Sequence, residues 1–129
     1  MKNDTEILAL LLSSNAKVYL KDRTFTQKIV LNGDNIRLDG QGSGLAVSDL
    51  VSTTIVNNVI EISGNNCVVR GVRFNANAEH CIKFTGLSNG ITFENCIFDG
   101  ANYPTGIFWY GGGNWLEGDM TLKNCLVQK

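Results

Sequence analysis

Short runs of alternating apolar and polar residues recur along the chain, and each run stops at a glycine or an asparagine. Alternation with a period of two is typical of a β-strand with one buried face, and Gly and Asn best tolerate the positive φ of a tight bend. Four of these runs align with one another: residues 36–40, 67–71, 91–95 and 120–124. We interpret them as equivalent strands of a repeat whose loops differ in length.

The residues on both sides of these runs repeat as well. After the bend, residues 72–74, 96–98 and 125–127 align with one another. Before the run, residues 29–31, 60–62 and 82–84 align, and we assign residues 107–109 to the same position. Each repeat therefore contains three short strands, which predicts a coil of parallel β-structure whose successive strands stack ~4.8 Å apart.

Stacking of the repeats predicts ladders of equivalent side chains. The inward ladders are Ile36, Cys67, Ile91 and Met120; Leu38, Val69, Phe93 and Leu122; and Phe74, Phe98 and Val127. A further ladder at the bend contains Gly40, Gly71, Asn95 and Asn124, where stacked amides can hydrogen-bond. We expect the apolar ladders to form the hydrophobic interior.

The outward positions of the same runs carry charges whose sign alternates from one repeat to the next. They are Asp39, Arg70, Glu94 and Lys123, and Glu61 lies beside Lys83 in the neighbouring strand set. Opposite charges side by side on a sheet contribute ~0.2–1 kcal/mol each. The alternation was not used to align the repeats, so it supports the alignment independently, and it predicts a structural rather than a catalytic face.

The N-terminal segment, residues 1–15, has a different pattern. Asp4 or Thr5 is a candidate helix cap, strong helix formers follow, and Asn15 is a candidate end of the helix. A solenoid exposes its first core layer unless another element covers it. We therefore expect a capping α-helix over residues 1–15 and a single β-helical domain over residues 16–129.

Composition excludes several classes of protein. The chain has 129 residues, a formal net charge of −1 and 43% hydrophobic residues, which argues against disorder and against binding of nucleic acid through phosphate contacts. Its longest apolar runs are too short to span a membrane, and residues 7–12 are not followed by a cleavage site. We therefore expect no signal peptide, no membrane partner and synthesis in the cytoplasm.

Cysteine spacing gives no sign of a metal site. Cys67, Cys81, Cys96 and Cys125 form no CxxC pair, and the chain has one histidine. A zinc site is therefore not expected. We interpret the cysteines as buried, unpaired residues in a protein that folds under reducing conditions.

Residues 18–25, 29–31 and 35–42 resemble the opening of the pectin-lyase-like right-handed parallel β-helices, in which a strand, a turn ending in an aromatic residue and further strands lead to a G-x-G sequence. The resemblance implies an all-β, right-handed, single-stranded parallel β-helix, here of about four turns with the N-terminal capping α-helix. That superfamily includes pectate and pectin lyases, polygalacturonases and phage tailspikes. The glycosidase signatures, Gly-His-Gly among them, are absent, and His80 falls in an expected loop, so an enzyme is less expected than a binding module.

Four aromatic residues in one segment are the candidate binding site: Tyr103, Trp109, Tyr110 and Trp115, with three glycines at 111–113. Three interpretations remain open. Trp109 can continue the inward ladder after Phe84 with Trp115 packed over the loop, or the group can form a subunit interface or a platform for sugar rings.

Three carboxylates near that segment are the candidate catalytic residues: Asp99, Glu117 and Asp119. A suitably spaced pair would serve glycoside hydrolysis, and the same groups could hold calcium. The alternative is solvated loop charge. We expect no cofactor, with calcium as the one alternative.

Two further features concern association. Residues 43–58 form the longest expected loop, which could cover one face of the coil or add strands. With outward Ile97 and Leu126 it could also make an apolar patch. The sequence ends in a strand, whose open edge invites pairing. We expect a carbohydrate-recognising module in a homo-oligomer, and the resemblance to tailspikes implies a trimer and a virion component. The alternatives are a fragment of a polysaccharide lyase or glycoside hydrolase, and a purely structural solenoid for assembly.

Overall fold

The computed structural model describes residues 3–20, 23–40, 54–75, 81–86, 88–99, 108–110 and 120–128. These residues form one helix and three parallel sheets. Sheet A contains β1 (Lys17–Tyr19), β4 (Arg37–Asp39), β7 (Val68–Arg70), β10 (Ile91–Glu94) and β13 (Met120–Lys123). Sheet B contains β2 (Thr24–Phe25), β5 (Thr54–Val56), β8 (Val72–Asn75), β11 (Ile97–Asp99) and β14 (Leu126–Gln128). Sheet C contains β3 (Ile29–Leu31), β6 (Ile60–Ile62), β9 (Ile82–Phe84) and β12 (Phe108–Tyr110).

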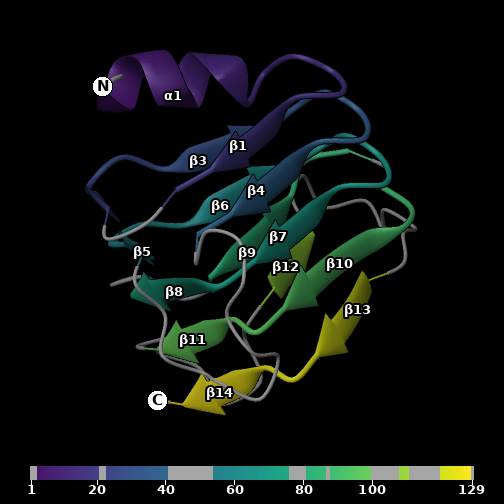
Figure 1. The fold of residues 1–129 in the computed structure, drawn as a ribbon. Coiled ribbons are helices and arrows are strands. Elements are labelled where there is room, and N and C mark those ends of the chain that lie inside the picture. Colours follow the sequence, from purple (N-terminus) through teal and green to yellow (C-terminus); the bar gives the residue numbers. More distant parts are fainter. Residues whose placement is uncertain are drawn as a thin grey trace.

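The chain visits the three sheets in a fixed order, from sheet C to sheet A to sheet B, and then begins again one strand further along (Figure 1). Each inner strand pairs in parallel with its equivalent in the preceding and following passage, as β4 does with β1 and β7, and the described end strands of each sheet pair on one side. This arrangement confirms an all-β parallel β-helix with an N-terminal helix. Such a coil buries the inward residue of each strand, which explains the alternating pattern of the sequence.

The predicted ladders are confirmed where the structure describes them. Leu38 pairs with Val69, Val69 with Phe93, and Phe93 with Leu122. Phe74 and Phe98 pair in sheet B, with stacked rings 5.5 Å apart. Phe93 meets both rings edge-on, at 6.2 Å and 5.4 Å between centroids. These geometries are the favourable ones for aromatic pairs, and they place an aromatic cluster inside the coil.

Asparagine and glycine occupy two corners of the coil. The corner after sheet A has positive φ at Gly71, Asn95 and Asn124, as the alternating runs predict. Asn124 Nδ2 donates a hydrogen bond to Asn95 Oδ1 at 2.8 Å, which confirms an amide ladder. Asn95 Nδ2 has no hydrogen-bond partner among the described residues, because the preceding position of the ladder is Gly71 and offers no side-chain acceptor.

The corner before sheet A is a second ladder that the sequence analysis did not identify. It has positive φ at Asn15, Asn35, Asn66 and Gly90. Asn35 Nδ2 donates to Asn15 Oδ1 at 3.1 Å. The expectation that Asn15 ends the helix is therefore wrong. Asn15 belongs to the first bend of the coil, because its left-handed conformation turns the chain into β1.

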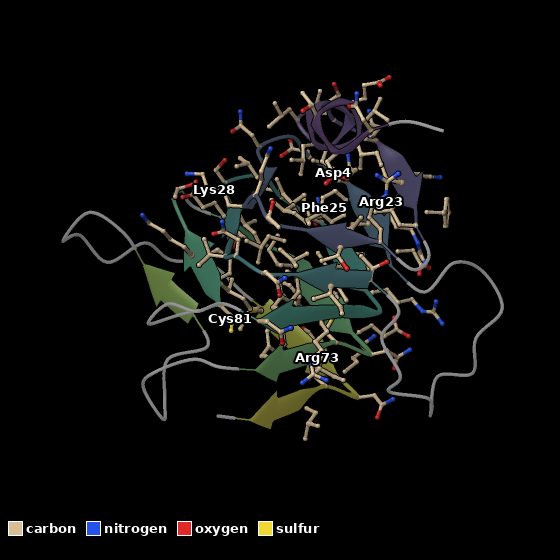
Figure 2. The ribbon with its side chains drawn as sticks, turned by 90° about the vertical axis from the view of Figure 1, so that its left-hand side faces the viewer. Asp4, Arg23, Phe25, Lys28, Arg73 and Cys81 are labelled. Atoms are coloured by element: carbon tan, nitrogen blue, oxygen red, sulfur yellow. The ribbon has the colours of Figure 1, made fainter. Side chains whose placement is uncertain are left out.

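Helix α1 (Asp4–Leu10) lies across the N-terminal end of the coil, opposite β13 and β14 (Figure 1). Its N-cap is Asn3, not Asp4 or Thr5: the Asn3 side chain accepts from the Glu6 backbone at 2.9 Å, and the Glu6 side chain bonds back to the Asn3 backbone. Asp4 is instead engaged by Arg23 at 2.7 Å (Figure 2). Ile7 and Leu11 are buried against the core, so the predicted capping role is confirmed.

The structure bears on the expected loop at residues 43–58 and on the expected apolar patch of Ile97 and Leu126. The expected loop 43–58 adds a strand, which is one of the alternatives left open by the sequence: residues 54–56 form β5, which pairs with β2 and β8 in sheet B. Residues 43–53 lie outside the described residues. Ile97 does not form an exposed patch with Leu126, because Ile97 is buried whereas Leu126 is 41% exposed.

All four cysteines lie among the described residues and no disulfide joins them, as expected. Cys67, Cys81 and Cys96 are buried and Cys125 is partly buried. In the described part of the chain, no helix has the length and apolar character needed to cross a membrane.

Candidate functional site

The aromatic strand β12 is the edge strand of sheet C and pairs with β9. Phe108 pairs with Ile82, Trp109 with Lys83, and Tyr110 with Phe84. The expected strand at residues 107–109 is therefore displaced by one residue. A displacement by one residue moves every side-chain position to the opposite face of the sheet. In backbone register Tyr110, not Trp109, pairs with Phe84, which differs from the expected alignment that sets Trp109 after Phe84.

The register places Trp109 in a row with residues that face away from the core. In the described strands of sheet C this row is Val30, Glu61 and Lys83, each only partly buried. The intervening residues, such as Ile82 and Phe84, are buried. We name Lys28, Val30, Glu61, Lys83 and position 109 the sheet-C surface. The predicted pairing of Glu61 with Lys83 is confirmed as a register pair.

An ion pair lies in the middle of the sheet-C surface. Lys28 Nζ is 3.0 Å from Glu61 Oε1, and Lys28 is exposed while Glu61 is largely covered. The sequence analysis missed this contact because Lys28 precedes the strand at 29–31 and lies outside the aligned positions. The signal in the sequence was that Lys28 directly precedes the strand at residues 29–31, whose neighbour in the next repeat contains Glu61. The pair supplies both a cation and a carboxylate next to the outward row.

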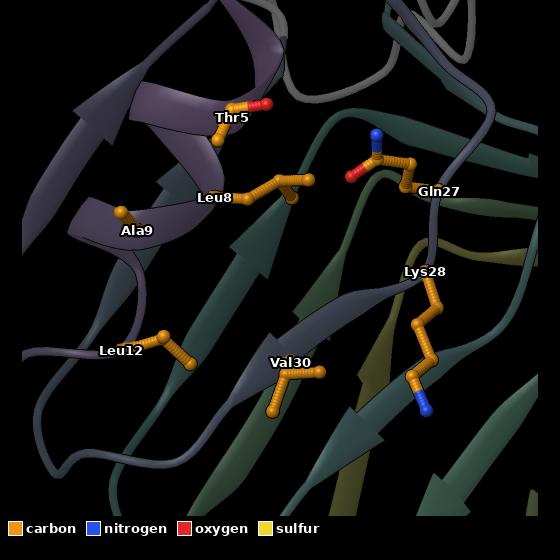
Figure 3. Close-up of a pocket in the computed structure, with 7 residues that line it drawn as sticks. All are labelled: Thr5, Leu8, Ala9, Leu12, Gln27, Lys28 and Val30. Atoms are coloured by element: carbon orange, nitrogen blue, oxygen red, sulfur yellow. The ribbon is translucent and has the colours of Figure 1, made fainter.

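A shallow groove adjoins the N-terminal end of the same surface (Figure 3). Its volume is about 280 Å³, and α1 and the segment around β3 form its walls. The lining residues are Thr5, Leu8, Ala9, Leu12, Gln27, Lys28 and Val30. Val30 and Lys28 belong to both features, so an apolar groove, a charged centre and an aromatic position follow one another along the outer side of sheet C.

The alternating charges of sheet A lie side by side, as predicted, and the first pair of the row is buried. Arg70 NH1 is 3.1 Å from Asp39 Oδ2, and Asp39 and Arg70 are only 2% and 9% exposed. Arg37 NH2 approaches the same oxygen at 3.7 Å. Burial removes water from both charges, so each needs the other as a partner. Because the charges of the pair satisfy each other, we interpret the pair as structural, in keeping with the sequence analysis.

Two thiols are stacked at the corner after sheet A. Cys125 occupies the position that follows Cys96 in the repeat, and the Cys96 thiol hydrogen-bonds the Cys125 sulfur. This hydrogen bond lowers the pKa of Cys125 to about 7. Burial raises the pKa of Cys96 well above its ordinary value. Cys125 is therefore the thiol with the most thiolate character among those whose pKa is shifted.

The remaining candidates are not brought together by the described structure. Asp99 lies at the end of β11, where its backbone pairs with Asn75 and Gln128. Tyr103, Trp115, Glu117, Asp119 and His80 lie outside the described residues. Among the residues that the structure does describe, no three His, Cys, Asp or Glu side chains converge as metal ligands. The catalytic and calcium hypotheses therefore stay predictions.

No family model, curated protein or solved structure matches this chain. Membership of the pectin-lyase-like superfamily accordingly stays a prediction from the residues quoted above. The site has to be interpreted from its own chemistry.

Proposed function

We propose that this chain is a glycan-binding β-helix module and that the sheet-C surface is its binding site. The observation that supports the proposal is the register of β12 on β9, which pairs Trp109 with Lys83 on the outward row. A tryptophan side chain that follows this row would offer an indole face for stacking against an apolar sugar face.

The neighbouring groups suit a carbohydrate. Ligand sites combine an apolar or aromatic surface with a few polar groups that fix orientation. Here Lys83, Glu61 and Lys28 follow Trp109 along the outward row or beside it, and they offer donors and acceptors for hydroxyl groups. The strands rise ~4.8 Å apart along the coil axis, so the row presents an extended ladder of contacts that suits a chain of sugar units.

We also propose that the chain binds the glycan without cleaving it and that it does so as a homo-oligomer. Asp99, Glu117 and Asp119 are not assembled in the described structure, so nothing in it favours hydrolysis or elimination over binding. The resemblance to tailspikes supports a trimer and a role as a virion component. An assembly-only solenoid is the competing hypothesis, and it predicts no glycan affinity.

The test is a binding screen of the whole chain against immobilised bacterial surface polysaccharides and pectins. We expect at least one polysaccharide to bind, and Trp109→Ala to weaken its Kd about tenfold or more, in keeping with the loss of a central aromatic contact. Tyr19→Ala is the matched control, because Tyr19 is an exposed aromatic residue on β1, in sheet A. It should leave the Kd unchanged.

Three results would contradict the proposal. Absence of binding across the screen would favour the assembly-only solenoid, and unchanged affinity in Trp109→Ala would show that glycan binds elsewhere than the sheet-C surface. Release of cleaved glycan that disappears in Asp119→Asn would instead favour the enzyme alternative.

A further inference from the structure

The first two strands of sheet A place two cations side by side on the outer face of the coil. Strands β1 and β4 pair in parallel, and Lys17 pairs in register with Arg37 (Figure 1). Both residues belong to the outward positions of their strands, because the residues that follow them, Val18 and Leu38, are buried. Neighbouring strands lie ~4.8 Å apart, and like charges in such positions destabilise a sheet.

The carboxylate beside these cations is already engaged. Arg37 NH2 lies 3.7 Å from Asp39 Oδ2, which is beyond hydrogen-bond distance. Both oxygens of Asp39 accept hydrogen bonds from Arg70 NH1, at 3.3 Å and 3.1 Å. The side chain of Lys17 is exposed and makes no hydrogen bond or ion pair with a residue that the structure describes. The outer face of β1 and β4 therefore has an excess of positive charge.

The guanidinium of Arg37 contains a donor that lacks an acceptor. Its Nε is buried and has no hydrogen-bond partner among the described residues, although the side chain as a whole is 41% exposed. A buried donor without a partner costs free energy, so proteins satisfy such groups with their own acceptors, with water or with an ion. The Nε and NH2 groups form one edge of the guanidinium, and this edge fits two oxygens of a phosphate or a carboxylate.

We propose that Lys17 and Arg37 form a binding site for a phosphate group. Charge favours phosphate over a carboxylate: a phosphate ester carries about −1.5 to −2 at pH 7, which matches two cations, whereas a carboxylate carries a single charge. Arg37 donates to two oxygens of the phosphate through Nε and NH2, and the ammonium group of Lys17 binds a third. The site lies on sheet A, so it goes beyond the proposed glycan binding on sheet C and does not depend on it.

The test is a titration of the whole chain with inorganic phosphate, followed by ¹H–¹⁵N NMR at constant ionic strength so that screening does not change. We expect the Nε–H signal of Arg37 to shift and to saturate. Arg37→Gln, followed through the backbone signals of β1 and β4, should raise the Kd about tenfold or more, because it removes the charge-assisted fork. Arg37→Lys keeps the charge but loses the fork, so it should also weaken binding.

Lys17→Gln tests the second cation and should raise the Kd by about threefold or more, in keeping with the loss of a single point charge. Lys17 is exposed, so this variant is available if the Arg37 variants fail to fold, which circular dichroism checks. Lys123→Gln is the matched control: Lys123 is an exposed lysine of the same sheet, but its register partner is Glu94. It should leave the Kd unchanged.

A second titration, with methyl phosphate, distinguishes the two sources of such a group. Binding as tight as that of inorganic phosphate would support a site for a phosphorylated molecule, and exclusion of the ester would support a site for the free ion. Absence of a saturable shift with either probe would overturn the proposal. Equal affinity of the wild type and Lys17→Gln would overturn it as well, as would equal affinity of the wild type and a folded Arg37→Lys.

Discussion

Asp39 and Arg70 occupy neighbouring positions of one ladder, and their charges are held away from water. Removing one partner of a buried pair leaves the other charge uncompensated, which costs about 3–5 kcal/mol. We predict that Arg70→Ala lowers the free energy of unfolding by about that amount, measured by urea denaturation. Lys123→Ala is the control, because Lys123 belongs to the same ladder but is exposed, and its effect should stay within about 0.5 kcal/mol. Equal effects of the two variants would contradict a buried pair.

Cys125 provides a prediction of pH dependence. Its pKa is lowered from 9.0 to about 7 by the hydrogen bond from Cys96, so the folded protein releases this proton earlier than the unfolded chain does. We expect thiolate absorbance of the folded protein in dilute solution to rise through about pH 7. The step should vanish in Cys125→Ala and move upward in Cys96→Ala.

The lowered pKa of Cys125 also determines the direction in which the free energy of unfolding changes with pH. Because the folded thiol has the lower pKa, Cys125 adds to the free energy of unfolding as pH rises from about 7 towards 9.0, and this contribution is lost as pH falls through about 7. The raised pKa of Cys96 acts in the opposite direction at higher pH. A first thiolate step near 9.0 in the folded wild type would show that the hydrogen bond does not lower this pKa.

At the residue scale, the sequence predicted which charged residues lie side by side better than it predicted which of them are buried. The sign alternation from Asp39 to Arg70 follows from neighbouring strands, and it is visible once the repeats are aligned. Whether such a pair is covered depends on what lies over the sheet, and the alternation contains no information about that. The register of Trp109 was missed for a related reason: residues 107–110 are all apolar or aromatic, so no alternation fixes the face of each residue.

At the scale of elements, α1 owes its position to two buried residues. Leu11 is fully buried against the coil, whereas Leu12 is exposed at the groove. We predict that Leu11→Ala lowers the free energy of unfolding by about 2–5 kcal/mol. Leu12→Ala should change it by less than about 1 kcal/mol. Urea denaturation of both variants measures the difference, and similar effects would contradict a capping role for α1.

The strands themselves were largely predictable because each has alternation and a bend residue after it. Strand β10, for example, alternates from Ile91 to Glu94 and ends at Asn95, whose φ is 55°. The short strand β5 has no Gly or Asn bend directly before it and lies at the end of a long apolar segment, so it was assigned to a loop. The N-cap at Asn3 was missed because three successive residues, Asn3, Asp4 and Thr5, are all good caps.

At the scale of the whole molecule, α1 covers one end of the coil, and the outer face of sheet C combines aromatic, charged and apolar positions. The proposed glycan site depends on the register of β12 against β9, since a shift by one residue would move Trp109 to the opposite face of the sheet.

The most direct test of the account is the solvent exposure of Trp109. The chain has two tryptophans, so Trp115→Phe leaves Trp109 as the sole reporter. We predict that iodide quenches its fluorescence nearly as well as it quenches the urea-unfolded variant. The matched control adds Phe108→Trp and Trp109→Phe to Trp115→Phe, which moves the indole by one residue. Its fluorescence should be protected from iodide, because position 108 pairs with buried Ile82. A protected Trp109 together with an exposed indole at 108 would contradict the register, and with it the proposed glycan site.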